Sequence, residues 1–279
     1  MDVILLGTGS PIPSAERAGP ATLVRAGGAT LLIDCGRGVV MRLAGAGVAP
    51  PTISAILLTH MHSDHICDLN DVITTHWVMN VAPTPLRVFG PKGAKALVEA
   101  TLAMLAFDVK YRIDHHDDLS SPPSVETTEL EPGDAFSVGD CRISAHRTDH
   151  SPVFPTLGYR IEAGGLAAAI AGDTIPCPEL DVLCQGADVY VQTVIREDLV
   201  RRVPSRRLQD ILDYHSTVEQ AAQTAGRAGV RTLMLTHYVP ALMKGQEEEW
   251  RALARPHFAG EIVLGDDLTR VSVTERAAS

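Results

Sequence analysis

Short apolar segments alternate with polar, glycine-containing segments along the whole chain. The apolar segments are mostly too short for a helix and end abruptly, as buried strands do. Several of them, such as residues 30–33 and 53–58, are followed at once by polar residues in a turn. On this pattern we predict strands at residues 3–6, 21–25, 30–33, 53–58, 86–89, 125–130, 135–138, 141–146, 156–162, 166–171, 188–191, 231–235, 262–264 and 270–273.

Between these strands, the pattern predicts helices at residues 39–46, 94–106, 178–183, 218–228 and 247–253, and another that begins near residue 66. Residues 108–123 are predicted to be polar and irregular. Strands and helices recur in similar order in the two halves, without a repeat of fixed period. Interspersed strands and helices predict an α/β fold in which sheets pack together under covering helices. No linker divides the chain, so we expect residues 1–279 to form a single domain.

Composition narrows the choice of function. Of the 279 residues, 45% are hydrophobic, enough for a large core, and the formal net charge is −10. This charge argues against a general nucleic-acid-binding surface, because affinity for a polyanion depends on clustered lysine and arginine. The scattered cysteines contain no Cys-x-x-Cys pair and are expected to be reduced thiols. With a strand directly after the N-terminus and no apolar segment long enough to cross a bilayer, we predict a cytoplasmic protein without a membrane partner. The cysteines are Cys35, Cys67, Cys141, Cys177 and Cys184.

The strongest chemical signal follows the predicted strand at 53–58. Three imidazoles and a carboxylate, those of His60, His62, His65 and Asp64, lie within six residues. Alternate residues of an extended segment point to the same side, so His60 and His62 can face one spot. Imidazole and carboxylate are ligands that zinc prefers. Four ligands in so short a segment cannot easily surround one tetrahedral ion, which favours two adjacent metals.

Three further candidate ligands stand at the ends of predicted strands. His150 follows residues 141–146, Asp173 follows residues 166–171, and His237 follows residues 231–235. Buried strands can deliver such side chains to one edge of a sheet, where rigid scaffolds position functional groups. A single histidine or aspartate at a strand end is more often only a satisfied polar group. Three of them together with residues 60–65 predict a two-metal site.

These segments resemble the metallo-β-lactamase superfamily, in the branch that holds ribonuclease Z, cyclic phosphodiesterases and arylsulfatase-like enzymes. The resemblance runs from residue 3 to about residue 240, and its carriers are residues 5–10, 32–36, 60–65, 155–160, 172–174, 215–217 and 235–237. It implies a four-layer αββα sandwich and a metal-dependent hydrolase with two Zn²⁺ ions, Mn²⁺ and Fe²⁺ remaining open. It also implies a homodimer.

By position, the resemblance assigns His60, His62 and His150 to one zinc. It assigns Asp64, His65 and His237 to the other, with Asp173 as the bridge. Metal-bound hydroxide would be the nucleophile, because metal binding lowers the pKa of water toward about 7. The resemblance also makes His215 a candidate general acid. Asp64 and His215 are therefore the catalytic candidates.

The chain departs from ribonuclease Z at two places. Thr193 stands where that enzyme has the glutamate of a His-Glu-Ala-Thr motif, and residues 161–172 are too few for its long tRNA-gripping arm. Together with the acidic balance, these departures predict a small-molecule substrate, with nucleic acid unlikely. The expected reaction is hydrolysis of a sulfate ester, phosphodiester, carboxylic ester or lactone. The alternative is a tRNA 3′-processing endonuclease; an iron redox enzyme and a non-catalytic protein are less consistent with the complete ligand set.

Two polar clusters have no assigned role. An arginine-rich segment precedes His215 and is either a solvated helix face, the favoured interpretation, or a clamp for an anionic group. Its members are Arg196, Arg201, Arg202, Arg206 and Arg207. His115 and His116 lie in the predicted irregular segment and are expected to face solvent, although that loop could overhang the site.

Overall fold

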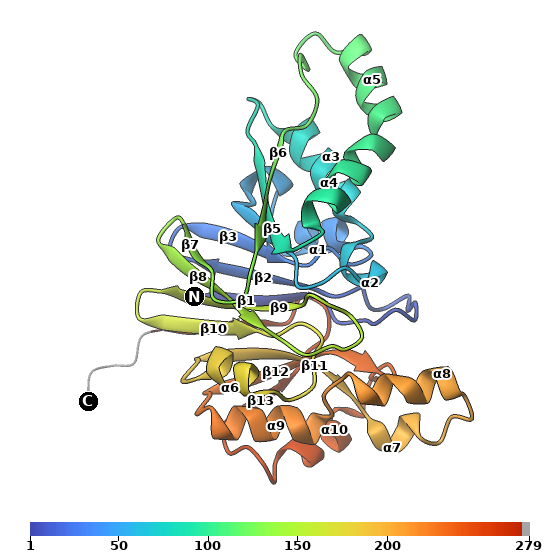
Figure 1. Ribbon diagram of the computed structural model, residues 1–279, viewed down its shortest axis with the longest axis vertical. Coiled ribbons are helices and arrows are strands. Elements are labelled where there is room, and N and C mark those ends of the chain that lie inside the picture. Colours follow the sequence, from blue (N-terminus) through green and yellow to red (C-terminus); the bar gives the residue numbers. More distant parts are fainter. Residues whose placement is uncertain (275–279) are drawn as a thin grey trace.

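The computed structural model describes residues 1–274, which form two seven-stranded sheets packed face to face (Figure 1). The first sheet has the strand order β14-β1-β2-β3-β4-β5-β6. Its strands are β1 (Asp2–Gly7), β2 (Ala21–Ala26), β3 (Ala29–Ile33), β4 (Ala55–Leu57), β5 (Leu86–Pro91), β6 (Val125–Leu130) and β14 (Arg270–Ser272). Neighbours are parallel from β3 to β6 and antiparallel elsewhere in this sheet.

The second sheet has the order β13-β12-β11-β10-β9-β8-β7. It is antiparallel from β7 to β10 and parallel from β10 to β13. Its strands are β7 (Ala135–Val138), β8 (Cys141–Arg147), β9 (Leu157–Ala163), β10 (Leu166–Ile170), β11 (Val189–Ile195), β12 (Thr232–Val239) and β13 (Glu261–Leu264). Every predicted strand coincides with an observed one.

Helices cover the outer faces of both sheets and complete four layers (Figure 1). Apolar residues of α1 (Val39–Gly45), α3 (Leu69–Met79) and α4 (Ala94–Met104) pack on the first sheet. Those of α6 (Pro178–Cys184), α9 (Val218–Arg227) and α10 (Glu247–Ala254) pack on the second. The α/β class and the αββα sandwich predicted from the sequence are confirmed. Among residues 1–274, no helix is both long and apolar enough to cross a membrane.

Side chains alternate between two cores because successive residues of a strand point to opposite faces. Leu31 and Ile33 of β3 are buried between the sheets, whereas Leu32 is buried under the helices. Ile143 and Ile161 meet them from the second sheet. Burial of each such side chain stabilises the fold by roughly 1.5–3 kcal/mol. The inter-sheet core therefore fixes how the two sheets face each other.

Two hydrogen bonds join the sheets where β4 ends. The backbone N–H of Leu157 donates to the Thr59 carbonyl (2.9 Å), and the Tyr159 hydroxyl donates to the Leu58 carbonyl (2.6 Å). The histidine-rich segment starts at this junction and continues into the short helix α2 (Ser63–Ile66). A side chain of this segment can therefore face groups delivered by the second sheet.

One predicted irregular segment is helical instead. Residues 106–115 form α5 (Ala106–His115), which extends away from the two sheets (Figure 1). None of its residues is buried, and its aromatic side chains Phe107 and Tyr111 are exposed, so packing on the sheets does not stabilise it. Ion pairs one turn apart support it instead, between Lys110 and Asp114 and between Arg112 and Asp108. His115 is its last residue, and the exposed His116 follows it.

The arginine-rich segment and the residues after it fold into three short helical pieces, none of which is among the helix ranges predicted above. They are α7 (Glu197–Val200), α8 (Arg206–Gln209) and a 3₁₀ helix, Asp210–Asp213. Leu208, Ile211 and Leu212 pack against a small apolar cluster that includes Val239 at the end of β12. This packing holds the segment beside the ends of β11 and β12.

Candidate metal centre

The first group of candidate ligands brings three ring nitrogens together. His62 Nδ1 lies 3.0 Å from His60 Nε2 and 3.2 Å from His150 Nε2. His60 and His62 come from the loop after β4, and His150 from the loop after β8, so two sheets supply this group. His60 and His150 are fully buried. Asp173 shares the group, its carboxylate being within 4.8 Å of the three nitrogens.

The second group consists of Asp64, His65 and His237, all buried. Asp64 Oδ2 lies 3.2 Å from His237 Nε2 and 3.7 Å from His65 Nε2. Asp64 and His65 belong to α2, whereas His237 lies within β12. His237 has a left-handed backbone (φ = 53°), which is uncommon for a residue other than glycine and occurs most often at functional sites.

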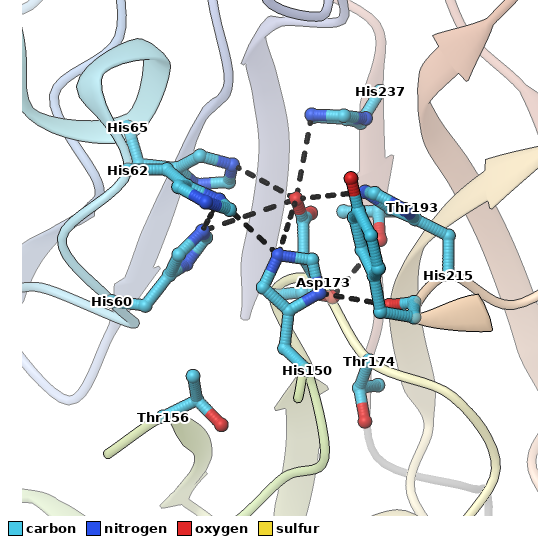
Figure 2. A network of polar contacts seen from close by, with 12 residues as sticks. His60, His62, His65, His150, Thr156, Asp173, Thr174, Thr193, His215 and His237 are labelled. Carbon is cyan, nitrogen blue, oxygen red and sulfur yellow. Dashed lines mark hydrogen bonds and ion pairs between the residues drawn. The ribbon is translucent and has the colours of Figure 1, made fainter. Parts of the chain in front are cut away.

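Asp173 lies between the two groups (Figure 2). Gly172 precedes it with φ = 67°, and this turn directs the carboxylate into the space between the sheets. Its Oδ2 atom lies 3.3–3.9 Å from one nitrogen of each of His60, His65, His150, His215 and His237. The structure therefore brings all seven sequence-predicted ligands and His215 into one cluster.

The outer nitrogens of His60, His65 and His150 are held by hydrogen bonds. His65 Nδ1 donates to Asp34 Oδ2 (2.8 Å), which also accepts from the Thr59 hydroxyl (2.8 Å). Because that hydroxyl proton is used, His60 Nδ1 donates to Thr59 Oγ1 (3.0 Å). His150 Nδ1 donates to the Tyr214 carbonyl (2.8 Å). Each bond fixes a tautomer whose Nε2 lone pair points into the cluster.

Asp34 is the functional residue that the sequence did not reveal. It directly follows β3, and its oxygens also accept the Thr59 backbone N–H (2.8 Å). A carboxylate that accepts from a ligand histidine orients the ring and raises its basicity as a ligand. The signal in the sequence was an aspartate placed directly after a buried strand, the same context as that of Asp173.

Burial and nearby charge act on the two histidine groups in opposite directions. Burial lowers the pKa of His60 well below its ordinary value and that of His150 to about 4. Burial also disfavours the charged form of His65, but Asp173 and Asp34 outweigh it and raise its pKa. Asp173 is likewise buried, yet His237 and His65 lower its pKa well below the ordinary value. A neutral imidazole and an ionised carboxylate are the ligand forms, so His65 would lose a proton on binding a metal.

The cluster has the properties of a cation site. Within residues 1–274, the buried atoms His65 Nε2 and Asp173 Oδ1 have no hydrogen-bond partner. Buried polar atoms are nearly always satisfied, so unpaired lone pairs aimed at one space call for a cation. Nitrogen and carboxylate oxygen donors suit zinc and similar divalent metals. The residues present therefore fit bound metal ions.

A backbone carbonyl, not a carboxylate, holds the Nδ1 side of His215. Its Nδ1 donates to the Ile211 carbonyl (3.0 Å), and its Nε2 lies 3.3 Å from Asp173 Oδ2. Thr193 is buried and donates to the Gly172 carbonyl (3.1 Å) instead of reaching the imidazole. The backbone of the 3₁₀ helix thus orients His215. In ribonuclease Z, by the resemblance described above, this task falls to the glutamate that Thr193 replaces.

A cavity of about 380 Å³ opens beside the cluster. One wall is the loop after β1, and the other is the segment 205–215. Its lining residues are Ser10, Pro11, Ile12, His62, Ser63, Asp64, Asp173, Ser205, Arg207, Leu208, Ile211, Tyr214, His215, His237 and Val239. The volume lies within the range of small-molecule binding sites. His115 and His116 are not among these residues.

Comparison with known proteins decides the family. A model of the beta-lactamase superfamily domain matches residues 29–238. A protein named Ribonuclease Z from Mycolicibacterium gilvum (strain PYR-GCK) is 56% identical over 98% of this chain and 96% of its own. Another of that name, from Mycobacterium tuberculosis (strain ATCC 25618 / H37Rv), is 52% identical over 99% of both chains. The chain belongs to the metallo-β-lactamase superfamily, in its ribonuclease Z family.

Solved structures agree with this family on the fold. The short form of human tRNase Z has a TM-score of 0.72 at 22% identity and covers 99% of this chain and 100% of its own. The metallo-β-lactamase fold protein YhfI from Bacillus subtilis has a TM-score of 0.75 at 20% identity, over 97% and 98%. As a member of the family, the chain is a metal-dependent hydrolase.

Membership in the ribonuclease Z family overturns two expectations. The small-molecule ester substrate was the wrong choice, and so was the statement that nucleic acid is an unlikely partner, because relatives 52–56% identical over the full chain are named Ribonuclease Z. The missing glutamate is not evidence against a ribonuclease Z, because the Ile211 carbonyl orients His215 in its place. The net charge does not exclude an RNA substrate, because it averages over the whole surface and says nothing of the charge beside a cavity.

Proposed function

We propose that the chain is a ribonuclease Z, a metal-dependent endonuclease that cleaves precursor tRNA at its 3′ end. The observation that carries this proposal is the identity of 52–56% over essentially the whole chain with proteins of that name. The cluster of histidines and aspartates beside a cavity supports it, because it supplies the parts that phosphodiester hydrolysis needs. The cavity adjoins both candidate metal groups.

The proposed ligand assignment follows the two groups. His60, His62 and His150 hold one metal, and Asp64, His65 and His237 hold the other. Asp173 stands between them and contributes to both, since a carboxylate has two oxygens and its charge screens two cations. We propose zinc as the metal, supported by the nitrogen-rich donor set. Elemental analysis of the purified protein, expected to give two zinc ions per chain, separates zinc from Mn²⁺ and Fe²⁺.

When bound, two such metals polarise the phosphate and lower the pKa of water toward neutrality. His215 is positioned to move a proton. Its Nδ1 hydrogen is engaged by the Ile211 carbonyl, so Nε2 is the nitrogen that faces the cavity. We propose that His215, in its imidazolium form, gives the proton on Nε2 to the oxygen that leaves phosphorus when the phosphodiester bond breaks, and keeps its Nδ1 hydrogen on the Ile211 carbonyl. Asp64 is proposed both as a metal ligand and as the second catalytic residue. Its Oδ2 lies 3.2 Å from Nε2 of His237, a ligand of the same group.

The deciding experiment is cleavage of a precursor tRNA that carries a 3′ extension. The purified, zinc-loaded protein should cut once, at the boundary between tRNA and extension, and should leave mature tRNA uncut. Protein with Asp64→Ala, prepared in the same way, should be inactive and excludes contaminating nucleases. An intact precursor in the presence of properly folded, metal-loaded protein would refute the proposal.

Three further properties are part of the proposal. We expect the protein to act in the cytoplasm, which is supported by its five free cysteines. We expect residues 1–279 to work as one domain, supported by ligands drawn from both sheets. We also expect a homodimer, on the resemblance to its branch of the superfamily. Sedimentation equilibrium of the metal-loaded protein tests the oligomeric state.

A further inference from the structure

The five arginines of the segment before His215 separate into two kinds. Arg196 is buried, donates to both oxygens of Asp198 (2.7 and 2.8 Å) and lies over the Trp250 ring. Arg201 donates to Glu197 (2.7 Å), one helical turn earlier. These two side chains are occupied within the fold. Arg202, Arg206 and Arg207 are exposed, and none of the carboxylates in residues 1–274 lies within 4.0 Å of their nitrogens.

Arg207 alone among them lines the cavity beside the candidate metal centre. It is also the sole arginine or lysine in that lining, which otherwise carries the carboxylates of Asp64 and Asp173. An acidic partner on the protein would occupy the Arg207 guanidinium. Arg207 has none within the described residues, so its fork of donors remains available to a ligand.

The backbone that carries Arg207 is fixed. Ser205 caps α8 by accepting from the Leu208 N–H (3.4 Å), and its backbone carbonyl accepts from the same residue (3.1 Å). Leu208 and Ile211 pack on the apolar cluster at the end of β12. Ile211 also orients His215 through its carbonyl. Arg207 is thus presented from the same short segment that sets the position of His215.

We propose that Arg207 binds a phosphate of the RNA substrate adjacent to the one that is cleaved. This inference rests on the proposed function and names a residue that positions the substrate. A guanidinium matches the geometry of a phosphate with two parallel hydrogen bonds. The cavity, at about 380 Å³, has room for more than the reacting phosphate. Arg207 then supplies, beside the site, the positive charge that the overall composition lacks.

The test compares two substrates. Precursor tRNA has phosphates on both sides of the cleaved bond, whereas bis(p-nitrophenyl) phosphate has only the reacting one. With Arg207→Ala, kcat/KM for precursor tRNA should fall about tenfold or more, mainly through a higher KM. The loss should be several times larger than the loss for the small diester. Arg207→Lys, which keeps the charge without the fork, should recover part of the activity.

Arg206→Ala and Arg201→Ala are the matched controls. Both remove an exposed arginine from the same segment, but neither residue lines the cavity, so kcat/KM should stay within about twofold of wild type. Salt gives a second measurement. Loss of one phosphate contact should make the slope of log(kcat/KM) against log[salt] shallower by about 0.7–0.9 for Arg207→Ala. Arg201→Ala should leave that slope nearly unchanged.

The outcomes separate the two proposals. Equal activity of Arg207→Ala and Arg201→Ala on precursor tRNA overturns the inference while the function stands. An equal loss on both substrates also overturns it, because Arg207 would then serve the fold or the chemical step. If wild-type protein hydrolyses the diester but leaves precursor tRNA intact, the proposed function fails and the inference fails with it.

Discussion

Asp34 is not a candidate ligand, but its hydrogen bonds orient histidines that are. Its Oδ2 accepts from His65 Nδ1 and from the Thr59 hydroxyl, so one carboxylate fixes two candidate ligand histidines. Asp34→Asn replaces this acceptor by an amide, which is neutral and presents N–H groups as well. Outer hydrogen-bond partners of this kind typically change metal affinity by about 10–100-fold. We expect zinc affinity to fall by that amount, measured by competition with a chelating dye.

Asparagine is a fair replacement at this position because Asp34 has φ = 62°. Asparagine, like aspartate, is among the residues that best tolerate a left-handed backbone, so the fold should persist. Circular dichroism of the metal-free variant checks this point. If the variant is folded and binds zinc as tightly as wild type does, Asp34 does not tune the ligands.

His215 allows a sharper separation of roles, because its Nε2 also lies near the candidate ligands Asp173 and His237. If His215 acts as a general acid, His215→Ala should lower kcat for precursor tRNA by about 10²–10⁴-fold. Metal content should stay at the wild-type value, as measured by elemental analysis of the same sample. Loss of one metal equivalent would instead make His215 a ligand.

Residue types and spacing pointed to the seven candidate ligands, because each lies near the end of a strand that its apolar run reveals. The role of Asp34 could not be predicted in this way. It depends on the parallel pairing of β3 with β4, which puts Asp34 beside Thr59. The pattern of apolar residues within a segment predicts a strand but not its neighbours in the sheet. The carbonyl of Ile211 was equally hidden, since any residue type provides one.

At the scale of elements, the turn that follows β10 depends on Gly172, the residue before Asp173. Gly172 has φ = 67°, and a Cβ there would lie 2.9 Å from Cβ and 3.0 Å from Oγ1 of the buried Thr59. Gly172→Ala should destabilise the protein by more than the about 1–2 kcal/mol of a left-handed backbone alone. It should also weaken metal binding, because Asp173 is the next residue. Urea unfolding and zinc titration measure the two effects.

Gly165→Ala is the matched control for that variant. Gly165 also has a left-handed backbone (φ = 73°), but a Cβ there would meet no atom within 4 Å. Gly165→Ala should lower the free energy of unfolding only by the about 1–2 kcal/mol of a left-handed backbone, and it should leave zinc binding unchanged. Similar losses of stability in the two variants, with normal zinc binding in both, would show that contact with Thr59 has no influence on the site.

The longer elements with a buried apolar face were predicted well, whereas short or solvent-facing helices were missed. α9 and β8 have such faces, and both lie where periodicity predicted them. α5 has no buried residue, and its many charged side chains favoured an irregular interpretation of residues 108–123. The pieces α7 and α8 have four residues each, too few for any period to appear.

At the scale of the whole molecule, net charge was the least informative property of the chain. A value of −10 counts carboxylates all over the surface, while binding of RNA depends on the field beside one cavity. The segment 196–207 holds five arginines, of which two are paired within the fold and only Arg207 lines the cavity. Composition could not distinguish the paired arginines from the unpaired ones, because pairing depends on which carboxylates the fold brings near.

The candidate ligands also come from both sheets, so bound metal should tie the sheets together. His60, His62, Asp64 and His65 follow β4, whereas His150, Asp173 and His237 belong to the second sheet. A ligand at 1,000 times its Kd stabilises the folded state by about 4 kcal/mol. For a chain of this size, zinc saturation of one site should therefore raise Tm by about 8 °C or more, measured by calorimetry against protein treated with chelator. Asp173→Ala should lose most of this shift and His215→Ala should keep it; an equal Tm with and without zinc would contradict the bridging of the sheets by metal.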